Sequence, residues 1–261
     1  MLPDALLETS GAAVSGRDPG AVWTHNDDGS ALYAIDERGR VLSEHRLPVE
    51  LRDWEDLAIA DCLSGSCLYL ADTGDNAERR SGGDVRIVRV PEPDPRARTA
   101  EEPSALEADV FPIALPDGAR DIEAIFVLPG ERVHLITKGR QHALTVYRYP
   151  GPLRRDTVVL EEVQRLSDGP RSLLAQVTGA SASADGSVVA VRTYQSLEFF
   201  QLHADTLARR PNGLVNLRTL EEIQGEAVAL GPEGLVVLTS EGGPLGGPAS
   251  MRLLTCRVEG G

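Results

Sequence analysis

Three glutamates recur at matching places in this sequence, and the residues around them do not explain how their charge is stabilised. Glu55, Glu123 and Glu226 lie among small and apolar residues, in the runs 54–57, 122–125 and 225–228. Such runs are typical of tightly packed strands, where an unpaired carboxylate is costly and must find a cation, hydrogen-bond donors or water. Two interpretations stay open: the glutamates line a water-filled tunnel in the centre of the fold, or they bind a cation. For the latter calcium is the natural choice, because the ligands are all oxygens.

A second set of polar residues follows the next predicted strand of each unit. These strand ends read His25-Asn26-Asp27, Asp72-Thr73-Gly74-Asp75-Asn76, Thr137-Lys138-Gly139, Arg192-Thr193-Tyr194 and Thr239-Ser240-Glu241. If the units surround one axis, these ends share one face around the mouth of the tunnel. We therefore take His25, Asp72, Asp75, Lys138 and Arg192 as candidate catalytic residues. Asp72 is also a candidate metal ligand, beside the three glutamates.

Two of these signals have simpler explanations that stay open. Lys138 is the only lysine of the chain, which suggests a specific point-charge contact, although chance would also explain it. The segment 72–76 lacks the Asp-x-Asp-x-Asp-Gly spacing and the distal Glu of an EF-hand, so turn formation by Asp, Gly and Asn is a sufficient explanation. The sequence contains no Gly-x-Ser-x-Gly, phosphate loop or His-Glu-x-x-His, and no defensible Ser-His-Asp pattern.

The elements that must position these residues recur at long intervals. The anchors Gly11, Glu55, Glu123, Gly179 and Glu226 are 44, 68, 56 and 47 residues apart, and each opens a turn and two further β-rich runs. A fourth, more polar strand is expected after most units, for example at 158–163. Short strands at this spacing, without long helical periodicity, indicate an all-β fold of the β-propeller type, with five blades and one domain over 1–261.

Two segments leave room for variants of this architecture. The Pro-rich insertion at about 91–110 reads as a surface loop, but a sixth blade is possible if it hides one. The last unit ends on its third strand near 257–258, so Pro3–Leu7 is expected to supply its outer strand and to close the ring.

Charge and composition exclude some function classes. The net charge of −14 argues against nucleic acid and anionic membranes, because phosphates demand clustered Lys and Arg. It permits cations and basic partners, or it only keeps the protein soluble. No run of about 18 apolar residues exists, so no transmembrane segment is expected. We expect a monomer whose partner is a small-molecule or protein ligand at the tunnel mouth.

The cysteines bear on the cellular compartment. Cys62 and Cys67 flank the short polar loop Leu-Ser-Gly-Ser, which would let one disulfide join two strand ends. A metal pair is disfavoured because no second Cys or His pair accompanies it, and two free thiols are the remaining alternative. A disulfide would imply an oxidising compartment, with Cys256 left over. No signal peptide is visible, and the chain is expected to be mature sequence.

Several of these runs also carry a family resemblance. The segments 23–27, 53–56, 70–76 and 225–227 resemble exported bacterial β-propeller proteins of unsettled function, which are loosely similar to phytase-like and esterase-like propellers. The resemblance implies a secreted, periplasmic or lipid-anchored protein with acidic residues at the axis. In calcium-dependent propeller phytases such acids hold calcium ions that bind phosphate. This chain departs from them in being shorter and in having one lysine, so no catalytic role is carried over.

The sequence therefore leaves three functions open. The first is an extracytoplasmic ligand-binding or interaction module with a calcium-type site. The second is a metal-dependent hydrolase of a small phosphate ester, ester or lactone, in which Lys138 and Arg192 bind the anion and Asp72 or Asp75 serves as base. The third is a scaffold whose tunnel is only structural.

Overall fold

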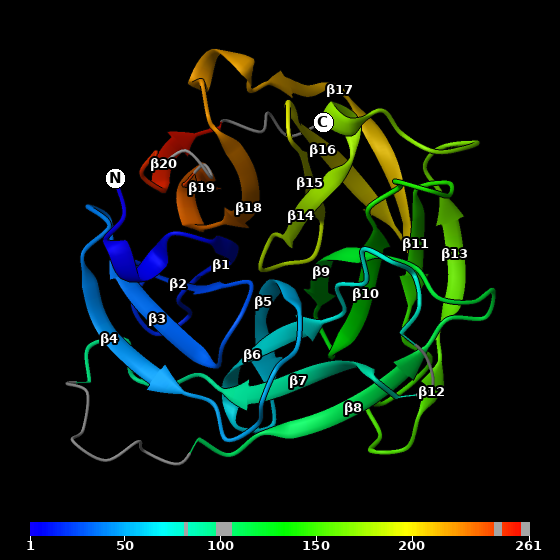
Figure 1. Ribbon diagram of the computed structural model, residues 1–261, viewed down its shortest axis with the longest axis horizontal. Coiled ribbons are helices and arrows are strands. Elements are labelled where there is room, and N and C mark those ends of the chain that lie inside the picture. Colours follow the sequence, from blue (N-terminus) through cyan, green and yellow to red (C-terminus); the bar gives the residue numbers. More distant parts are fainter. Residues whose placement is uncertain (81–82, 98–105, 243–246, 257–261) are drawn as a thin grey trace.

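Five antiparallel sheets stand around a common axis in the computed structural model, which describes residues 1–80, 83–97, 106–242 and 247–256 (Figure 1). The prediction of an all-β propeller with five blades is confirmed. No sixth sheet occurs among the described residues, and the segment 91–110 continues into an outer strand of the second sheet. Residues 98–105 of that segment lie outside the described part of the chain.

The blades follow one another along the chain, and each begins with its innermost strand. Blade 1 holds β1 (Thr9–Val14), β2 (Ala21–Asn26), β3 (Ala31–Asp36) and β4 (Val41–Arg46). Blade 2 holds β5 (Trp54–Cys62), β6 (Gly65–Asp72), β7 (Val85–Pro91) and β8 (Asp109–Ala114). Blade 3 holds β9 (Ile122–Leu128), β10 (Arg132–Thr137), β11 (Thr145–Arg148) and β13 (Glu161–Arg165). Blade 4 holds β14 (Val177–Ala182), β15 (Val188–Thr193), β16 (Ser196–His203) and β17 (Thr206–Asn216), and blade 5 holds β18 (Gln224–Leu230), β19 (Leu235–Glu241) and β20 (Ser250–Thr255).

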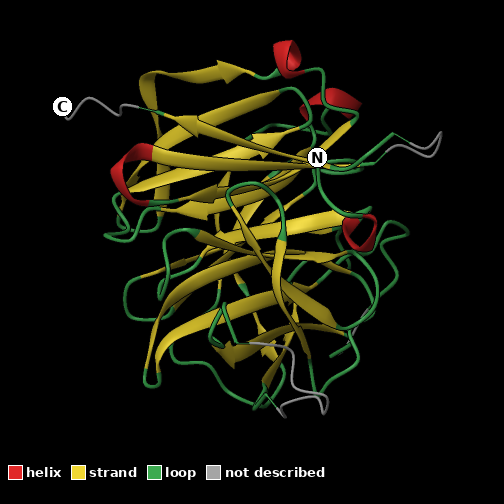
Figure 2. Cartoon of the chain, turned by 90° about the vertical axis from the view of Figure 1, so that its left-hand side faces the viewer, coloured by secondary structure: helices red, strands yellow, loops and turns green. Residues whose placement is uncertain are grey.

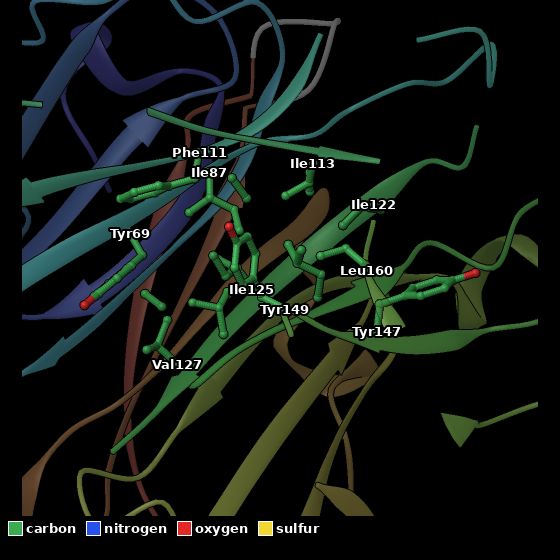
Figure 3. Close-up of a cluster of buried hydrophobic side chains, with 14 of the residues drawn as sticks. Tyr69, Ile87, Phe111, Ile113, Ile122, Ile125, Val127, Tyr147, Tyr149 and Leu160 are labelled. Carbon is green, nitrogen blue, oxygen red and sulfur yellow. The ribbon is translucent and has the colours of Figure 1, made fainter. Parts of the chain in front are cut away.

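The ring closes through its innermost strands and through apolar clusters between blades. β1, β5, β9, β14 and β18 contact one another in this order, and β18 returns to β1. Each pair of neighbouring blades encloses one of five buried clusters. Figure 3 shows the cluster between blades 2 and 3, which contains Tyr69, Ile87, Phe111, Ile113, Ile122, Ile125, Val127, Tyr147, Tyr149 and Leu160. Burying each large side chain stabilises the fold by about 1.5–3 kcal/mol, so these interfaces hold the blades together.

Two expectations about outer strands are wrong. Pro3–Leu7 does not add a strand to blade 5, because Asp4–Leu6 forms a 3-10 turn (η1) whose Leu6 packs between blades 5 and 1. The segment 158–163 is not one strand. Val158–Val159 forms β12, which pairs in parallel with β8 of blade 2, and only Glu161–Arg165 pairs with β11.

Helical structure is confined to single turns at strand ends, as Figure 2 shows. Besides η1, the described residues form η2 (Leu173–Ala175), η3 (Arg218–Leu220) and η4 (Pro232–Gly234). No helix in the described ranges is long and apolar enough to cross a membrane. The predicted disulfide is present: Cys62 and Cys67 join the ends of β5 and β6 across a tight turn, with Cα atoms 5.8 Å apart. Cys256 is the free cysteine.

Asp56 ties three blades together across the axis. Its Oδ1 accepts the N–H of Leu57 in its own strand at 2.8 Å. Its Oδ2 accepts the N–H of Ile125 in β9 at 3.0 Å and that of Ala180 in β14 at 3.2 Å. Complete burial raises the pKa of this carboxyl well above its usual range, although the three amide hydrogen bonds oppose the shift.

Replacing Asp56 should therefore loosen blades 2, 3 and 4 together. Asp56→Ala leaves three buried amides without acceptors, and we expect it to lower the free energy of unfolding by about 3 kcal/mol or more. Asp56→Asn keeps one oxygen and should cost less. Urea unfolding followed by the fluorescence of the two buried tryptophans measures both variants. Asp61→Asn, at the exposed end of the same strand, is the matched control, and an equal loss there would contradict this role for Asp56.

Candidate functional site

A β-bulge interrupts the innermost strand of every blade at the same level. The register with the second strand shifts between Thr9 and Ala12, between Trp54 and Asp56, and between Ile122 and Ala124. It shifts again between Val177 and Gly179 and between Gly225 and Val228. A bulge adds one residue to a strand and re-aims the side chain that it carries. The five bulges therefore set five side chains at equivalent places around the axis.

The bulged residues are of two kinds. Glu55, Glu123 and Glu226 occupy the bulges of blades 2, 3 and 5, as their sequence spacing suggested. Blade 4 carries Thr178, one residue before the predicted anchor Gly179, and the bulge of blade 1 includes Ser10 next to Gly11. The two hydroxyl groups bond to neighbouring bulges: Ser10 donates to the Glu55 carbonyl at 2.6 Å, and Thr178 donates to the Glu226 carbonyl at 2.8 Å.

Two of the glutamates meet a third acid that the sequence analysis missed. Oxygens of Glu55, Glu123 and Asp121 lie within 4.8 Å of one another; we call these three residues the axial acid cluster. Asp121 stands two residues before Glu123, and Asp53 stands likewise before Glu55, so a repeated Asp-x-Glu pattern would have revealed it.

Asp121 has one oxygen engaged and one free. Its Oδ1 accepts the backbone N–H of Asp75 at 2.9 Å. Its Oδ2 is buried and has no hydrogen-bond partner, and the residue is only 3 % exposed. A buried carboxylate oxygen without a donor is costly. The axial acid cluster therefore presents an acceptor whose partner is missing from the protein's own atoms.

Lys138 enters this cluster from the end of β10. Its Nζ donates to Glu123 Oε1 at 2.6 Å and lies 3.9 Å from Asp121 Oδ2. The other side of the cluster is closed by Gly74, where a Cβ atom would lie 2.1 Å from Glu55 Oε1. The turn 72–76 thus contributes close approach of its backbone, which only glycine permits.

Glu226 interacts with the charges of Glu241, Glu123 and Lys138. Its Oε1 accepts a hydrogen bond from Gln224 Nε2 at 2.8 Å, and the same amide group donates to Glu241 Oε2 at 2.8 Å. The Tyr194 phenol faces the same groups: its pKa is raised by burial and then by the charge of Glu226, while Lys138 opposes the shift. The charge of Lys138 therefore acts on all three predicted glutamates, and its ammonium group contacts Glu123.

Burial shifts the protonation of these groups. It raises the pKa of Glu55 and Glu226 well above the usual range, and that of Glu123 to about 8. The pKa of Lys138 is also raised, because burial is outweighed by the carboxylates, Glu123 foremost. The raised pKa values of the glutamates and of Lys138 agree with one arrangement: Lys138 is protonated beside one ionised carboxylate, and the other carboxyl groups hold protons.

A second, outer acid group lies at the same mouth. Oxygens of Glu8, Asp27 and Asp28 come within 4.8 Å of one another. Burial and the neighbouring carboxylates raise the pKa of Asp27 to about 6. Burial, and then the charge of Asp27, raise the pKa of Glu241 to about 7. The mouth therefore carries far more negative than positive charge.

Two of the predicted catalytic residues are occupied by structural contacts. Asp72 accepts hydrogen bonds from Arg80 and Arg86, both at 2.8 Å, so both of its oxygens are engaged. Arg192 is fully buried, where it donates to the carbonyls of Ala227 and Thr239 and pairs with Glu222. These contacts fix the turn after β6 and join blades 4 and 5. Sequence reasoning could not see them, because the partners belong to other elements.

Asp75 and His25 also lie near the mouth without joining the axial acid cluster. Asp75 Oδ2 accepts the Arg80 backbone N–H at 2.6 Å, while its own N–H holds Asp121. His25 is stacked on Trp54 with ring centres 3.8 Å apart. Burial lowers the pKa of His25 to about 4, so the ring is neutral at pH 7.

Comparison with known proteins supports the fold. No protein-family model matches the sequence, and no curated protein is similar to it. Among solved structures, the PQQ-bound aldose sugar dehydrogenase from Streptomyces coelicolor is 13% identical with a TM-score of 0.56, over 94% of this chain and 93% of that chain. A glucose dehydrogenase is 8% identical with a TM-score of 0.56, over 98% of both chains. A luciferin-regenerating enzyme is 10% identical with a TM-score of 0.54, over 96% of this chain and 92% of that one. At these identities the likeness shows a shared fold alone, and the resemblance to exported and phytase-like propellers stays a prediction.

The buried carboxyls predict how stability depends on pH without metal. With chelator present, the free energy of unfolding should fall as pH rises from 7 to 8.5. In this window the folded state still holds part of the protons on Glu123 and Glu241, whose pKa values of about 8 and about 7 lie well above the Glu pKa near 4.3 of the unfolded chain, and the raised pKa of Glu55 and Glu226 acts in the same direction. Each extra proton bound by the folded state lowers the free energy of unfolding by about 1.4 kcal/mol for each pH unit of increase. The histidines whose pKa is lowered act in the opposite sense, but only below about pH 6.5.

Urea titrations at several pH values in chelator measure this slope. Glu226→Gln removes one of the carboxyls and should make the decline shallower. A stability that stays level or rises between pH 7 and 8.5 would contradict the assignment of raised pKa values to this group.

Proposed function

We propose that this protein binds one divalent cation, calcium by its ligand chemistry, in the axial acid cluster. The observation that carries the proposal is Asp121 Oδ2, a buried acceptor without a donor, beside Glu55 and Glu123. Hydroxyl groups satisfy neighbouring backbone carbonyls at Ser10 and Thr178, whereas no described group donates to this oxygen. A cation supplies what the protein atoms leave out.

The donor set fits calcium. The cluster contains only carboxylate oxygens, with no Cys and no His, and calcium prefers six to eight oxygens at about 2.3–2.6 Å. Three carboxylates supply a core of that set, and water completes it. Asp72, the fourth predicted ligand, is left out of the proposal because Arg80 and Arg86 occupy its oxygens.

We place the protein outside the cytoplasm. The Cys62–Cys67 disulfide favours an oxidising compartment. Calcium is abundant in such compartments, so a site of moderate affinity would be filled there.

The ligand of the site lies, in this proposal, in a groove that opens at the same face. A cavity of about 480 Å³ runs between blades 3 and 4 and is lined by Leu144, Arg171, Val177, Thr193, Leu214 and Arg218, among others. Cavities of this size hold small molecules. The Val177 N–H donates to the Lys138 carbonyl at 3.1 Å, so the inner wall of the groove touches the acidic site. An apolar molecule with an anionic group suits this mixture of leucine and arginine.

Calcium titration by calorimetry tests the proposed cation site in the axial acid cluster. The chelator-treated wild type should bind one calcium ion, and calcium at one hundred times its Kd should add about 2.7 kcal/mol to the free energy of unfolding. Glu55→Gln and Asp121→Asn each remove a ligand charge, so both should weaken binding at least tenfold.

Glu37→Gln, in an exposed turn of blade 1, is the control and should bind as the wild type does. An absence of binding heat together with an unchanged melting temperature would remove the cation site. Equal affinity in Asp121→Asn would show that the free oxygen is not a ligand.

A second function is favoured by Glu226. Burial and the charges of Glu241 and Glu123 raise the pKa of this carboxyl well above its usual range, which is the direction that a general acid needs. A bound cation would polarise a carbonyl group at this place. In the hydrolase alternative Glu226 then holds or gives the proton, while Tyr194 orients the substrate. The sugar dehydrogenases and the luciferin-regenerating enzyme with this fold are enzymes by name, which is consistent with catalysis here.

The contacts of the basic residues narrow the substrate. Arg192 binds two carbonyls and Glu222, and Lys138 is held by Glu123, so little positive charge is left at the axial acid cluster itself for a phosphate undergoing reaction there. Neutral esters and lactones are therefore better substrates than phosphate esters.

A substrate panel in the presence of calcium tests the hydrolase alternative. We expect turnover of small lactones or carboxylic esters, no turnover of phosphate esters, and a loss of about 100-fold in kcat for Glu226→Gln. The calcium affinity of this variant, measured in parallel, separates a loss of chemistry from a loss of the cation. If no substrate turns over while calcium still binds, the protein is a binding module and not a hydrolase.

A further inference from the structure

The single lysine of this chain stands where a cation would bind. Lys138 Nζ is 2.6 Å from Glu123 Oε1, and this oxygen belongs to one of the three carboxylates of the axial acid cluster. Lys138 is only 6 % exposed, so solvent competes little for its ammonium group. It is the only positive group among the described residues whose hydrogen bond goes to this cluster.

The ammonium and a divalent cation cannot share this place. Oxygens that lie within 4.8 Å of one another surround a point only a few ångströms from each of them. A calcium ion there bonds at about 2.3–2.6 Å, which is the distance that the ammonium nitrogen already takes up at Glu123. Two positive charges so close together, in a buried setting, repel each other strongly.

We propose that Lys138 fills the cation's place in the metal-free protein and leaves it when a divalent cation binds, so that this lysine makes the site select divalent over monovalent ions. The inference rests on the proposed cation site. Exchanging the ammonium for sodium or potassium brings no additional positive charge to the acids. Exchanging it for calcium brings one more, and only this exchange repays the displacement.

The structure offers the displaced lysine a second partner. Glu226 and Tyr194 both interact with the charge of Lys138. The Glu226 side chain accepts one hydrogen bond, from Gln224, and no other side-chain hydrogen bond among the described residues, so it can accept the ammonium. The long and flexible lysine side chain can make this change without a movement of the strands.

Amine labelling follows the displacement directly, because the chain has only two amines. Acetylation with sulfo-N-hydroxysuccinimidyl acetate, read by peptide mass spectrometry, reports Lys138 against the exposed N-terminal amine as internal standard. We expect slow labelling of Lys138 in chelator and in 150 mM sodium chloride, and a rate at least fivefold higher with saturating calcium. An unchanged or slower rate with bound calcium overturns the proposal.

Lys138→Met gives an independent measurement. Calorimetry should show calcium binding at least tenfold tighter than in the wild type at low salt, because the competitor is gone. Sodium should weaken calcium binding in this variant and have little effect in the wild type. Lys138→Arg keeps a charge and should not gain affinity.

The cation site and the role of Lys138 are tested separately by these measurements. If the wild type shows no calcium binding, the cation site itself is wrong and this inference falls with it. If the wild type binds calcium while Lys138→Met binds no tighter and labelling of Lys138 is unaffected, the site stands and the role of the lysine is refuted. If Lys138→Met does not fold, labelling of the wild type decides alone.

Discussion

The inner edge of each blade ends in backbone groups that have no partner strand, and satisfying them is the constraint on which the centre of this propeller depends. A buried amide or carbonyl without a hydrogen bond costs about as much as a good apolar contact contributes. Asp56 meets the constraint for the amides of β9 and β14, and Arg192 meets it for the Ala227 carbonyl of β18. Ser10 and Thr178 serve carbonyls of neighbouring bulges, and Thr73 serves the carbonyl of Ile122. These polar side chains near the axis therefore form hydrogen bonds with backbone groups.

The same constraint separates residues with capacity left for a ligand from residues held by structural contacts. A polar residue whose atoms all reach strand edges or fixed arginines has no capacity left for a ligand, which describes Asp72 and Arg192. Glu55, Asp121 and Glu123 are different, because their carboxylates converge on one another with a single ammonium between them. Holding like charges together is unfavourable without protons or a cation. The candidate site is thus recognised because the repulsion among these three carboxylates is compensated only in part by one ammonium group.

Much of the fold was predictable, because each blade repeats a local pattern that the chain spells out in order. The inner, second and third strands lie where their small or β-branched runs predicted them, and Cys62 and Cys67 lie close enough in sequence for their pairing to be inferred. Pairing between blades was not visible. Val158–Val159 joins blade 2 in parallel although its sequence continues into blade 3, and no periodicity reports such a choice. The one-residue offset at Thr178 had a similar cause, since a bulge changes register without changing residue type.

The candidate site was predictable in its residue types and less so in its roles. The recurring glutamates were visible because packing did not explain them, and Asp121 was hidden only because the anchor chosen was the second acid of each Asp-x-Glu pair. The roles of Asp72 and Arg192 were decided by Arg80, Arg86 and Glu222. Of these, Arg86 and Glu222 lie in other strands or loops, so only three-dimensional contacts could assign them.

Departure from fivefold symmetry is what gives the mouth two distinct sides. Blades 2 and 3 bring Glu55, Asp121 and Glu123 together, whereas blade 4 has a threonine at the equivalent bulge and blade 1 includes a serine. A cation held by the acids is therefore displaced from the axis toward blades 2 and 3. The groove between blades 3 and 4 lies beside these acids, because Val177 of its wall donates to the Lys138 carbonyl. Five acids in a symmetric ring would spread their negative charge evenly around the axis, whereas hydroxyl groups at two bulges concentrate it on blades 2, 3 and 5.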